Sequence, residues 1–377
     1  MRVALITDGI WPYVLGGMQK HSFYLCKYLA QNKVNIDLVH FNNSNYNINK
    51  LEFFTNEEKK YITSIVINFP KSLPFPGHYI YNSYKHSKLI FKALQNNINA
   101  YDFIYTKGFA GWYLINKKKA VSCKIGVKFH GYEMFQKPPN FKIKLQNIFL
   151  LQYPVKKISQ NADVVFSYGG KITDIIKLIG VTNSKIFELP SGVESSIVAE
   201  TIKPTSNKIK FLYLGRYERR KGIEELNQAI LNIQNKDFEF HFIGPIPLPK
   251  KLQHKNIIYH NEVRDKALLN TLIKGCDILV CPSWSEGMPN VILEAMANGL
   301  AVLATNVGAT NVLVNDKTGW LIEQSNTVDI EKTLIEIINT NKTEVDLKKQ
   351  TALHSISQNF VWEKLIIKLI DELKNIA

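Results

Sequence analysis

The residues from Asp277 to Gly299 read Asp-Ile-Leu-Val-Cys-Pro-Ser-Trp-Ser-Glu-Gly-Met-Pro-Asn-Val-Ile-Leu-Glu-Ala-Met-Ala-Asn-Gly. Ile278 to Cys281 is a short apolar run with β-branched residues that stops at Pro282, which predicts a strand. Turn-forming residues follow, and a second apolar run continues to the end of the stretch. Pro289 suits the first turn of a helix, and Gly299 suits the position just after the last turn. The stretch therefore predicts a strand, a loop and a helix.

Two glutamates give this stretch its chemistry. Glu286 lies in the predicted loop, and Glu294 lies among apolar positions of the predicted helix. A carboxylate in apolar surroundings is costly unless it is paired, so we expect Glu294 to have a partner. The free N–H groups of Asn290 and Val291 at the helix start form an anion site, and carboxylates beside it could accept sugar hydroxyls, as a nucleotide sugar would require. For two isolated glutamates, a capping or salt-bridged Glu294 and a solvated Glu286 would be the simpler alternative.

The complete sequence of this stretch favours a nucleotide-sugar site. Ser283 to Gly299, followed by Ala301-Val-Leu-Ala-Thr-Asn-Val-Gly, resembles the signature region of the GT4 family of retaining glycosyltransferases. The resemblance implies the α/β GT-B fold, with two Rossmann-like, doubly wound parallel-sheet domains facing each other across a cleft. It implies that Glu294 holds the donor ribose and that Glu286 contacts the donor sugar. The segment between them would bind sugar and diphosphate through Gly287, Met288, Pro289, Asn290 and Val291.

A glycine pair follows the first predicted strand, Val3 to Thr7, and precedes a helix that we expect to reach about Ala30. Paired glycines let the backbone approach a ligand closely, although a lone pair is usually only a turn. In this position Gly16 and Gly17 resemble the glycine loop that GT4 enzymes place near the donor diphosphate and the acceptor. The loop contains no G-x-G-x-x-G, which argues against a dinucleotide-dependent oxidoreductase.

A histidine follows the predicted strand Lys124 to Phe129, in the sequence His130-Gly-Tyr-Glu. Ligands collect beyond the carboxyl ends of strands in open α/β sheets. A lone histidine is more often a structural hydrogen-bonding group or a general base, and a His-Glu pair without a third ligand is poor evidence for a metal. The motif resembles the HG loop of GT4 members, which implies that His130 reaches the donor sugar. The role of Glu133 stays open, and we expect neither metal nor cofactor.

A basic loop follows the predicted strand Lys210 to Leu214, with the sequence Gly-Arg-Tyr-Glu-Arg-Arg-Lys-Gly. Arg216 and Lys221 suit a diphosphate whose charge grows as it leaves, because arginine grips phosphate in a fork and lysine is a compact charge. A solvated basic turn is the alternative. The spacing resembles the family's diphosphate-binding pair, whereas Arg219 and Arg220 have no such match.

The chain of 377 residues is long enough for two domains, and 45% hydrophobic with 21% charged residues predicts a globular protein. We place an acceptor-binding domain at residues 1–195, a linker in the polar stretch Ser196 to Lys208, and a donor-binding domain at residues 208–359. By resemblance, backbone groups of Val263 and Arg264 read the nucleotide base. The amphipathic helix at residues 360–377 would cross back to the first domain.

Two further segments of the first domain carry structural predictions. Asn42 to Asn82 is rich in asparagine and is predicted to be irregular, and the resemblance would place it where acceptors bind, although its details are not a family signature. Phe141 to Gln160 is predicted to be helical, with a kink or break at Pro154.

The compartment follows from what the sequence lacks. Four scattered cysteines show no metal or redox spacing, which predicts reduced structural thiols in a cytoplasmic protein. No run of about 18 apolar residues predicts a membrane span, and the N-terminal apolar segment is too short for a signal peptide.

The formal charge of +15 is unevenly distributed. Residues 1–195 hold 25 Lys and Arg against 11 Asp and Glu, a net of +14, whereas residues 196–377 hold 22 against 21, a net of +1. A basic half can attract nucleic acid, an anionic membrane or an acidic substrate; a lysine- and asparagine-rich bias with solvated charge is the alternative. Because that bias has not charged the second half, we favour a functional surface. Stacking aromatics or a recognisable nucleic-acid motif do not accompany it, so we expect no nucleic-acid partner.

These observations predict a metal-independent retaining glycosyltransferase that uses a nucleotide-diphosphate sugar, with a UDP-sugar favoured and a GDP-sugar next. By resemblance, the departing phosphate takes the proton of the acceptor in a front-face substitution. The acceptor would be a saccharide or a lipid-linked sugar in cell-envelope polysaccharide or lipopolysaccharide assembly, and the basic half would lie on the inner face of the membrane. The alternatives are a GT-B nucleotide-sugar epimerase or hydrolase and a basic nucleic-acid-binding protein.

Overall fold

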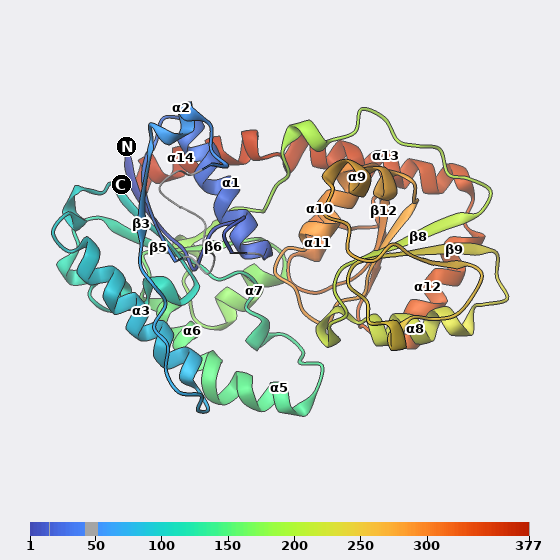
Figure 1. Ribbon diagram of the computed structural model, residues 1–377, viewed down its shortest axis with the longest axis horizontal. Helices are drawn as coiled ribbons and strands as arrows, with labels where there is room; N and C mark the ends of the chain where they lie inside the picture. The colour runs from blue at the N-terminus through green and yellow to red at the C-terminus, as the bar shows by residue number, and fades with distance from the viewer. Residues whose placement is uncertain (15, 42–51, 377) are drawn as a thin grey trace.

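The computed structural model describes residues 1–14, 16–41 and 52–376, which form two α/β halves side by side (Figure 1). Each half contains one sheet, and every strand pair in both sheets is parallel. The first sheet has the order β3-β2-β1-β4-β5-β6-β7, and the second has the order β10-β9-β8-β11-β12-β13. The predicted pair of doubly wound parallel sheets is confirmed.

The strands of the first sheet are β1 Arg2–Ile6, β2 Asn35–His40, β3 Ile62–Val66, β4 Phe103–Lys107, β5 Lys124–Lys128, β6 Val164–Ser167 and β7 Ile186–Glu188. Those of the second sheet are β8 Ile209–Leu214, β9 Phe238–Ile243, β10 Ile257–Tyr259, β11 Ile278–Cys281, β12 Ala301–Thr305 and β13 Gly319–Ile322.

The helices of the first half are α1 Gly17–Gln31, α2 Asn56–Lys59, α3 His78–Leu94, α4 Trp112–Asn116, α5 Phe141–Gln146, α6 Tyr153–Asn161 and α7 Lys171–Leu178. The remaining helices are α8 Ile223–Asn232, α9 Lys266–Lys274, α10 Asn290–Ala297, α11 Thr310–Leu313, α12 Thr327–Asn339, α13 Lys342–Asn359 and α14 Trp362–Ile376. Within the described residues, no helix is long and apolar enough to cross a membrane.

Both faces of each sheet are covered, which explains why the central strands are largely buried and apolar. In β1, Val3 and Leu5 pack with α1 and α14, whereas Ala4 and Ile6 pack with α3, α4, α6 and α7 on the opposite face. In the second half, α8 and α12 cover one face, and α9, α10, α11 and α13 cover the other. The carboxyl ends of both sets of strands face the boundary between the halves, where the candidate residues lie.

The last helix returns to the first half, as the sequence predicts. The ring of Trp362 in α14 stacks on that of Tyr28 in α1 with centroids 6.1 Å apart, and the Tyr28 hydroxyl donates to Glu363 at 3.0 Å. The domain boundaries at residues 195 and 208 stay a prediction.

One prediction about the first half is wrong. The segment from Asn42 to Asn82 is not irregular in its described part, because it contains α2, β3 and the start of α3. The Ile-Thr-Ser-Ile-Val sequence of β3 is rich in β-branched residues and forms the edge of the sheet beside β2. Phe141 to Gln160 is helical as predicted, and its irregular part is a π-helical turn at Asn147–Gln152 that directly precedes α6, in whose first turn Pro154 lies.

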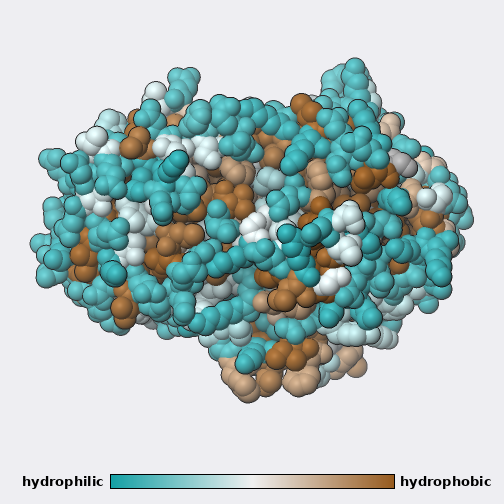
Figure 2. Space-filling model, turned by 180° about the vertical axis from the view of Figure 1, so that it is seen from behind, coloured by the Kyte–Doolittle hydropathy of each residue, from teal (hydrophilic) through white to brown (hydrophobic). Residues whose placement is uncertain are grey.

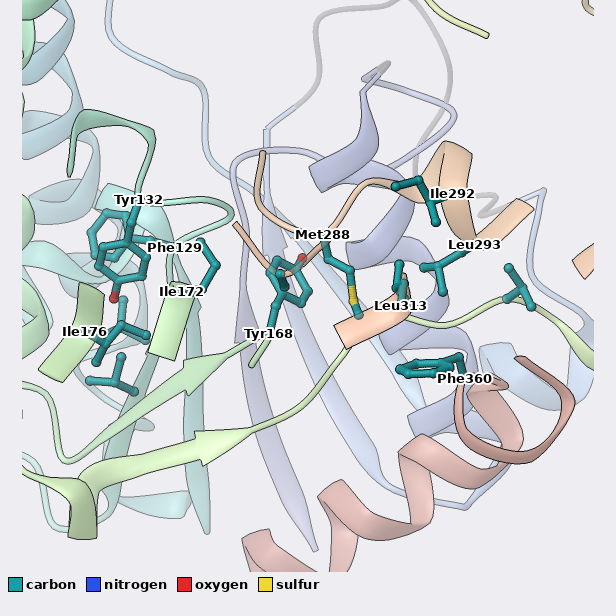
Figure 3. Close-up of a cluster of buried hydrophobic side chains, with 14 of the residues drawn as sticks. Phe129, Tyr132, Tyr168, Ile172, Ile176, Met288, Ile292, Leu293, Leu313 and Phe360 are labelled. Atoms are coloured by element: carbon teal, nitrogen blue, oxygen red, sulfur yellow. The ribbon is translucent and has the colours of Figure 1, made fainter. Parts of the chain in front are cut away.

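A continuous apolar cluster joins the two halves. It includes Tyr168 and Ile172 from the first half and Ile292 and Leu293 of α10 from the second. Figure 3 shows Met288 between these two groups, and its Sδ accepts a hydrogen bond from the Ser191 amide at 3.0 Å. The loop that carries the glutamates is therefore anchored in the first half by its methionine.

Candidate active site

The site is built on the loop between β11 and α10. This loop carries Glu286, and α10 begins at Asn290 after Pro289, which precedes the helix rather than forming its first turn. The first backbone bond at this end runs from Ile292 N to Pro289 O at 3.0 Å, so the amides of Asn290 and Val291 lie ahead of the bonded turns. Gly299 follows the helix with a φ of +83°, as expected for the residue after the last turn.

Glu286 is buried rather than solvated, with 7% of its surface exposed. Its Oε1 accepts hydrogen bonds from Lys221 Nζ at 2.5 Å and from Ser283 Oγ at 2.7 Å, and Arg220 lies 3.8 Å from Oε2. Burial raises the pKa of Glu286, but Lys221 and Arg220 outweigh it, so the pKa lies below its ordinary value. The carboxylate is therefore charged at neutral pH and held in a fixed position.

Glu294 has the partner that the sequence predicts, but it comes from the other half. Lys20 in α1 donates to Glu294 Oε1 at 2.5 Å. Beside this pair lies a cavity of only about 20 Å³, which Ser191 and Asn290 also line. That volume holds about one water molecule, so a ribose would fit here only after the Lys20–Glu294 pair has opened.

The three predicted ligand loops meet at one point. A Cβ atom placed on Gly17 would lie 3.3 Å from Asn290 Nδ2 and 3.9 Å from His130 Nε2. A Cβ atom on Gly287 would lie 1.9 Å from the carbonyl oxygen of His130, so only glycine allows this approach. Gly16 precedes α1 with a φ of +155°. The glycine pair, the histidine loop and the α10 terminus therefore form one cleft between the halves.

A glutamine that the sequence did not single out closes this cleft. Gln136 donates through Nε2 to the carbonyl oxygens of Gly131 and Glu286, both at 2.6 Å, and its Oε1 accepts from the Glu286 amide at 3.3 Å. The side chain thus ties the histidine loop to the glutamate loop. No local sequence pattern marks it, because its partner lies 150 residues away.

His130 is a neutral hydrogen-bonding group in this cleft. Burial, reinforced by the charge of Lys107, lowers the pKa of His130 to about 3. Its Nδ1 is hydrogen-bonded to the Tyr168 hydroxyl at 3.0 Å, so its Nε2 is left to face the cleft near Gly17. Glu133 lies three residues on, and burial raises the pKa of its carboxyl.

Two buried lysines lie beneath the cleft at the carboxyl ends of β4 and β5. Lys107 Nζ is hydrogen-bonded to His21 Nδ1 at 2.8 Å, and burial lowers the pKa of Lys107 to about 7. Lys128 donates to the Leu189 carbonyl oxygen at 2.7 Å, and burial lowers its pKa well below the ordinary value. The first half therefore supplies basic groups to the floor of the cleft.

The basic side chains of the loop after β8 have different partners. Lys221 reaches Glu286, whereas the Arg216 side chain is 70% exposed and pairs with Glu218 at 2.9 Å. Arg220, which the sequence analysis set aside, is the arginine that lies near Glu286, at 3.8 Å. Arg219 instead pairs with Glu225 of α8 at 2.7 Å. The structure thus brings Lys221 and Arg220 to the glutamate and leaves Arg216 at the rim.

The predicted base-binding residues lie just before α9. Val263 is half-buried, and the exposed Arg264 side chain pairs with Glu262 at 3.0 Å. Lys266, at the start of α9, lies over the Trp11 ring of the first half, 5.4 Å from its centroid. This segment therefore faces the loop after β1 across the boundary.

Part of the chain matches a known protein family. Residues 208–340 match the family described as Glycosyl transferases group 1. This part of the chain is therefore similar to group 1 glycosyltransferases. An uncharacterised glycosyltransferase of Methanocaldococcus jannaschii is 26% identical over 98% of both chains. A capsular polysaccharide biosynthesis glycosyltransferase of Staphylococcus aureus, CapM, is 25% identical over 48% of this chain and 54% of its own length.

The fold of the whole chain is also that of solved structures. Sucrose-phosphate synthase from Thermosynechococcus elongatus superposes with a TM-score of 0.76 at 17% identity, covering 99% of this chain and 98% of its own. The predicted GT-B fold is confirmed.

A second cavity opens from the first half toward His130. It has a volume of about 190 Å³, and its walls include the aromatic side chains Phe69, Tyr79 and Phe109. Asp8 and Glu133 also line it. Among the described residues, Asp8 Oδ1 is buried without a hydrogen-bond partner, and burial raises the pKa of this carboxyl. An unsatisfied buried carboxyl oxygen in an aromatic cavity is a position for a ligand hydroxyl.

Proposed function

We propose that this protein is a retaining glycosyltransferase that transfers a sugar from a nucleotide-diphosphate sugar to a hydroxyl of a saccharide or lipid-linked acceptor. A UDP-sugar is the first candidate donor and a GDP-sugar the second. The observation that carries the proposal is the meeting of Glu286, Lys221, His130 and the start of α10 in one buried cleft. The chemistry of that cleft suits an anionic leaving group beside a polyhydroxylated ring.

On the donor side, the diphosphate lies at the start of α10, where free amides and the helix dipole favour an anion. Lys221 is one of the cations near it, and Arg216 at the rim is free to swing from Glu218 onto a phosphate oxygen. Because the diphosphate gains charge as it departs, these contacts strengthen toward the transition state. The departing phosphate oxygen then takes the acceptor proton.

At the sugar, Glu286 and His130 hold hydroxyl groups in place. The carboxylate is charged and can only accept hydrogen bonds, whereas the neutral imidazole can accept or donate through Nε2. Glu294 binds the ribose hydroxyls once Lys20 has left it. Base recognition falls to the backbone of Val263 and Arg264.

The acceptor occupies the aromatic cavity beside His130. Sugar rings present apolar C–H faces that pack on aromatic side chains such as Phe69 and Tyr79, and the Asp8 and Glu133 carboxyls would bind their hydroxyls. The similarity to CapM, a capsular polysaccharide biosynthesis enzyme, supports an acceptor in cell-envelope polysaccharide assembly.

The test is to incubate the protein with UDP-sugars and GDP-sugars and a panel of saccharide acceptors, and to measure release of the nucleoside diphosphate. We expect release from one donor class, and NMR of the product should show retained anomeric configuration. Inversion would contradict the proposal. Nucleotide release with free sugar as the only product, whichever acceptor is added, would favour a hydrolase.

A further inference from the structure

The first half carries a group of exposed apolar side chains on its lower edge. Figure 2 shows brown and tan side chains gathered on a projection there, at the place where Figure 1 shows α5. Phe149 is 76% exposed, Phe141 is 70% exposed and Leu73 is 85% exposed. We define the apolar ridge as the six exposed residues Leu73, Phe75, Phe141, Leu145, Phe149 and Tyr153.

Helical spacing aligns the ridge. Phe141, Leu145, Phe149 and Tyr153 follow one another at intervals of four residues through α5, the π-helical turn and the start of α6. Side chains four apart lie on the same helix face, so these four form one line. The loop that carries Leu73 and Phe75 lies against the same region, since a Cβ atom on Gly77 would lie 3.5 Å from Leu150 Cδ2.

The segments that carry the ridge are basic. Residues 61–101 and 134–162 together hold nine lysines and no aspartate or glutamate. Lys71, Lys142, Lys144, Lys156 and Lys157 are exposed. In the described part of the chain, none of these five forms a salt bridge, and Lys157 lies over the Tyr153 ring. Apolar side chains flanked by unpaired lysines fit a surface that is apolar inside and anionic outside.

The ridge continues into the acceptor cavity. Phe69 and Tyr79 line that cavity, and the chain between them carries Leu73 and Phe75 of the ridge. A bilayer in contact with the ridge would therefore contact the same chain segment that forms part of the cavity wall. Exposed apolar groups of this kind rarely persist without a partner.

We propose that the apolar ridge inserts into the interface of an anionic lipid bilayer and so presents the acceptor cavity to a lipid-linked substrate. The ridge side chains enter the boundary between head groups and acyl chains, and the flanking lysines bind anionic head groups. The link to the acceptor rests on the proposed function, but the insertion itself does not.

The test is sedimentation of the full chain with vesicles of phosphatidylcholine alone or mixed with phosphatidylglycerol, without donor or acceptor. We expect binding to the mixed vesicles and little to the neutral ones. The variant Phe141→Ser/Phe149→Ser should lose about tenfold in affinity, because interfacial binding scales with the buried apolar area. Lys142→Gln/Lys144→Gln should lose up to about fivefold per lysine at low salt.

The matched control is Leu248→Ser/Leu347→Ser, which removes two exposed leucines from the second half. It should bind vesicles like the unmodified protein, and all variants should keep the same nucleotide-induced thermal shift if they are folded. Equal vesicle binding by the Phe141→Ser/Phe149→Ser variant would overturn the proposal. Absence of vesicle binding, together with a dimer that this variant dissociates, would assign the ridge to a second copy of the chain instead. If the unmodified protein binds the mixed vesicles but shows no nucleotide-induced thermal shift, only the proposed function is refuted.

Discussion

Replacing Lys221 by methionine keeps the length of the side chain and removes the charge that Glu286 contacts at 2.5 Å. Breaking a buried ion pair by removing one partner costs about 3–5 kcal/mol. Two groups reduce that cost, because Ser283 still donates to Glu286 and Arg220 remains 3.8 Å away. We therefore expect the free energy of unfolding at pH 7 to fall by about 2 kcal/mol, which is below the range for a buried charge left without any other partner.

The stability loss caused by Lys221→Met should depend on pH. In the unmodified protein the pKa of Glu286 is depressed, so its charged form stabilises the fold above the ordinary carboxyl pKa, and this stability is lost as the pH falls through the depressed value. Without Lys221 the pKa rises, and protonation then relieves the buried charge. The stability difference between Lys221→Met and the unmodified protein should shrink as the pH falls from 7 toward 4.

The assay is urea unfolding of both proteins, followed by tryptophan fluorescence at several pH values. Adding Glu286→Gln to Lys221→Met should recover about 1 kcal/mol, because an amide needs no counter-charge. If Lys221→Met is as stable as the unmodified protein at pH 7, or if Glu286→Gln adds further loss in the double variant, the buried-pair reasoning is refuted.

Three further predictions concern function. Lys221→Ala should lower kcat by about 10²-fold, with a smaller loss of donor affinity, because its charge acts mainly on the departing diphosphate; equal losses in steady-state kinetics and donor titration would exclude that role. Lys20→Met should raise the affinity for the nucleotide by up to about fivefold in calorimetry. The partly exposed Lys20–Glu294 ion pair is worth about 0.2–1 kcal/mol, and the variant no longer has to break it before Glu294 binds the ribose. Weaker binding would mean that Lys20 contacts the ligand. The imidazole of His130 should stay neutral down to pH 5 in an NMR titration, because its pKa is lowered to about 3. The same shift should make the fold lose stability as the pH falls below the ordinary histidine pKa, because the unfolded chain takes up the proton first. Titration of His130 near pH 6.5 would contradict this prediction.

The local parts of the site could be predicted because each is a short pattern. The strand, loop and helix from Ile278 to Ala297 follow from an apolar run, a proline and a terminal glycine. The glycine pair and His130 follow strands of a parallel sheet, so topology alone brings their loops to the cleft.

What the sequence could not supply are partners that lie far apart in the chain. That Glu294 needs a cation follows from burial, but its pairing with Lys20 across 274 residues does not. Gln136 and Arg220 were missed for the same reason, since neither belongs to a periodic pattern. The strand β3 was missed because the surrounding asparagines suggested a loop, although Ile62–Val66 is itself β-branched and apolar.

The most direct test of the donor site is a thermal-shift screen of UDP, GDP and ADP on the unmodified protein, Glu294→Ala and the control Glu344→Ala on α13. A nucleotide at about 100 times its Kd stabilises the folded state by about 2.7 kcal/mol. Selective stabilisation by one nucleotide that is lost in Glu294→Ala and kept in Glu344→Ala is the result we predict. An equal shift in Glu294→Ala would contradict the assignment of Glu294 to the ribose.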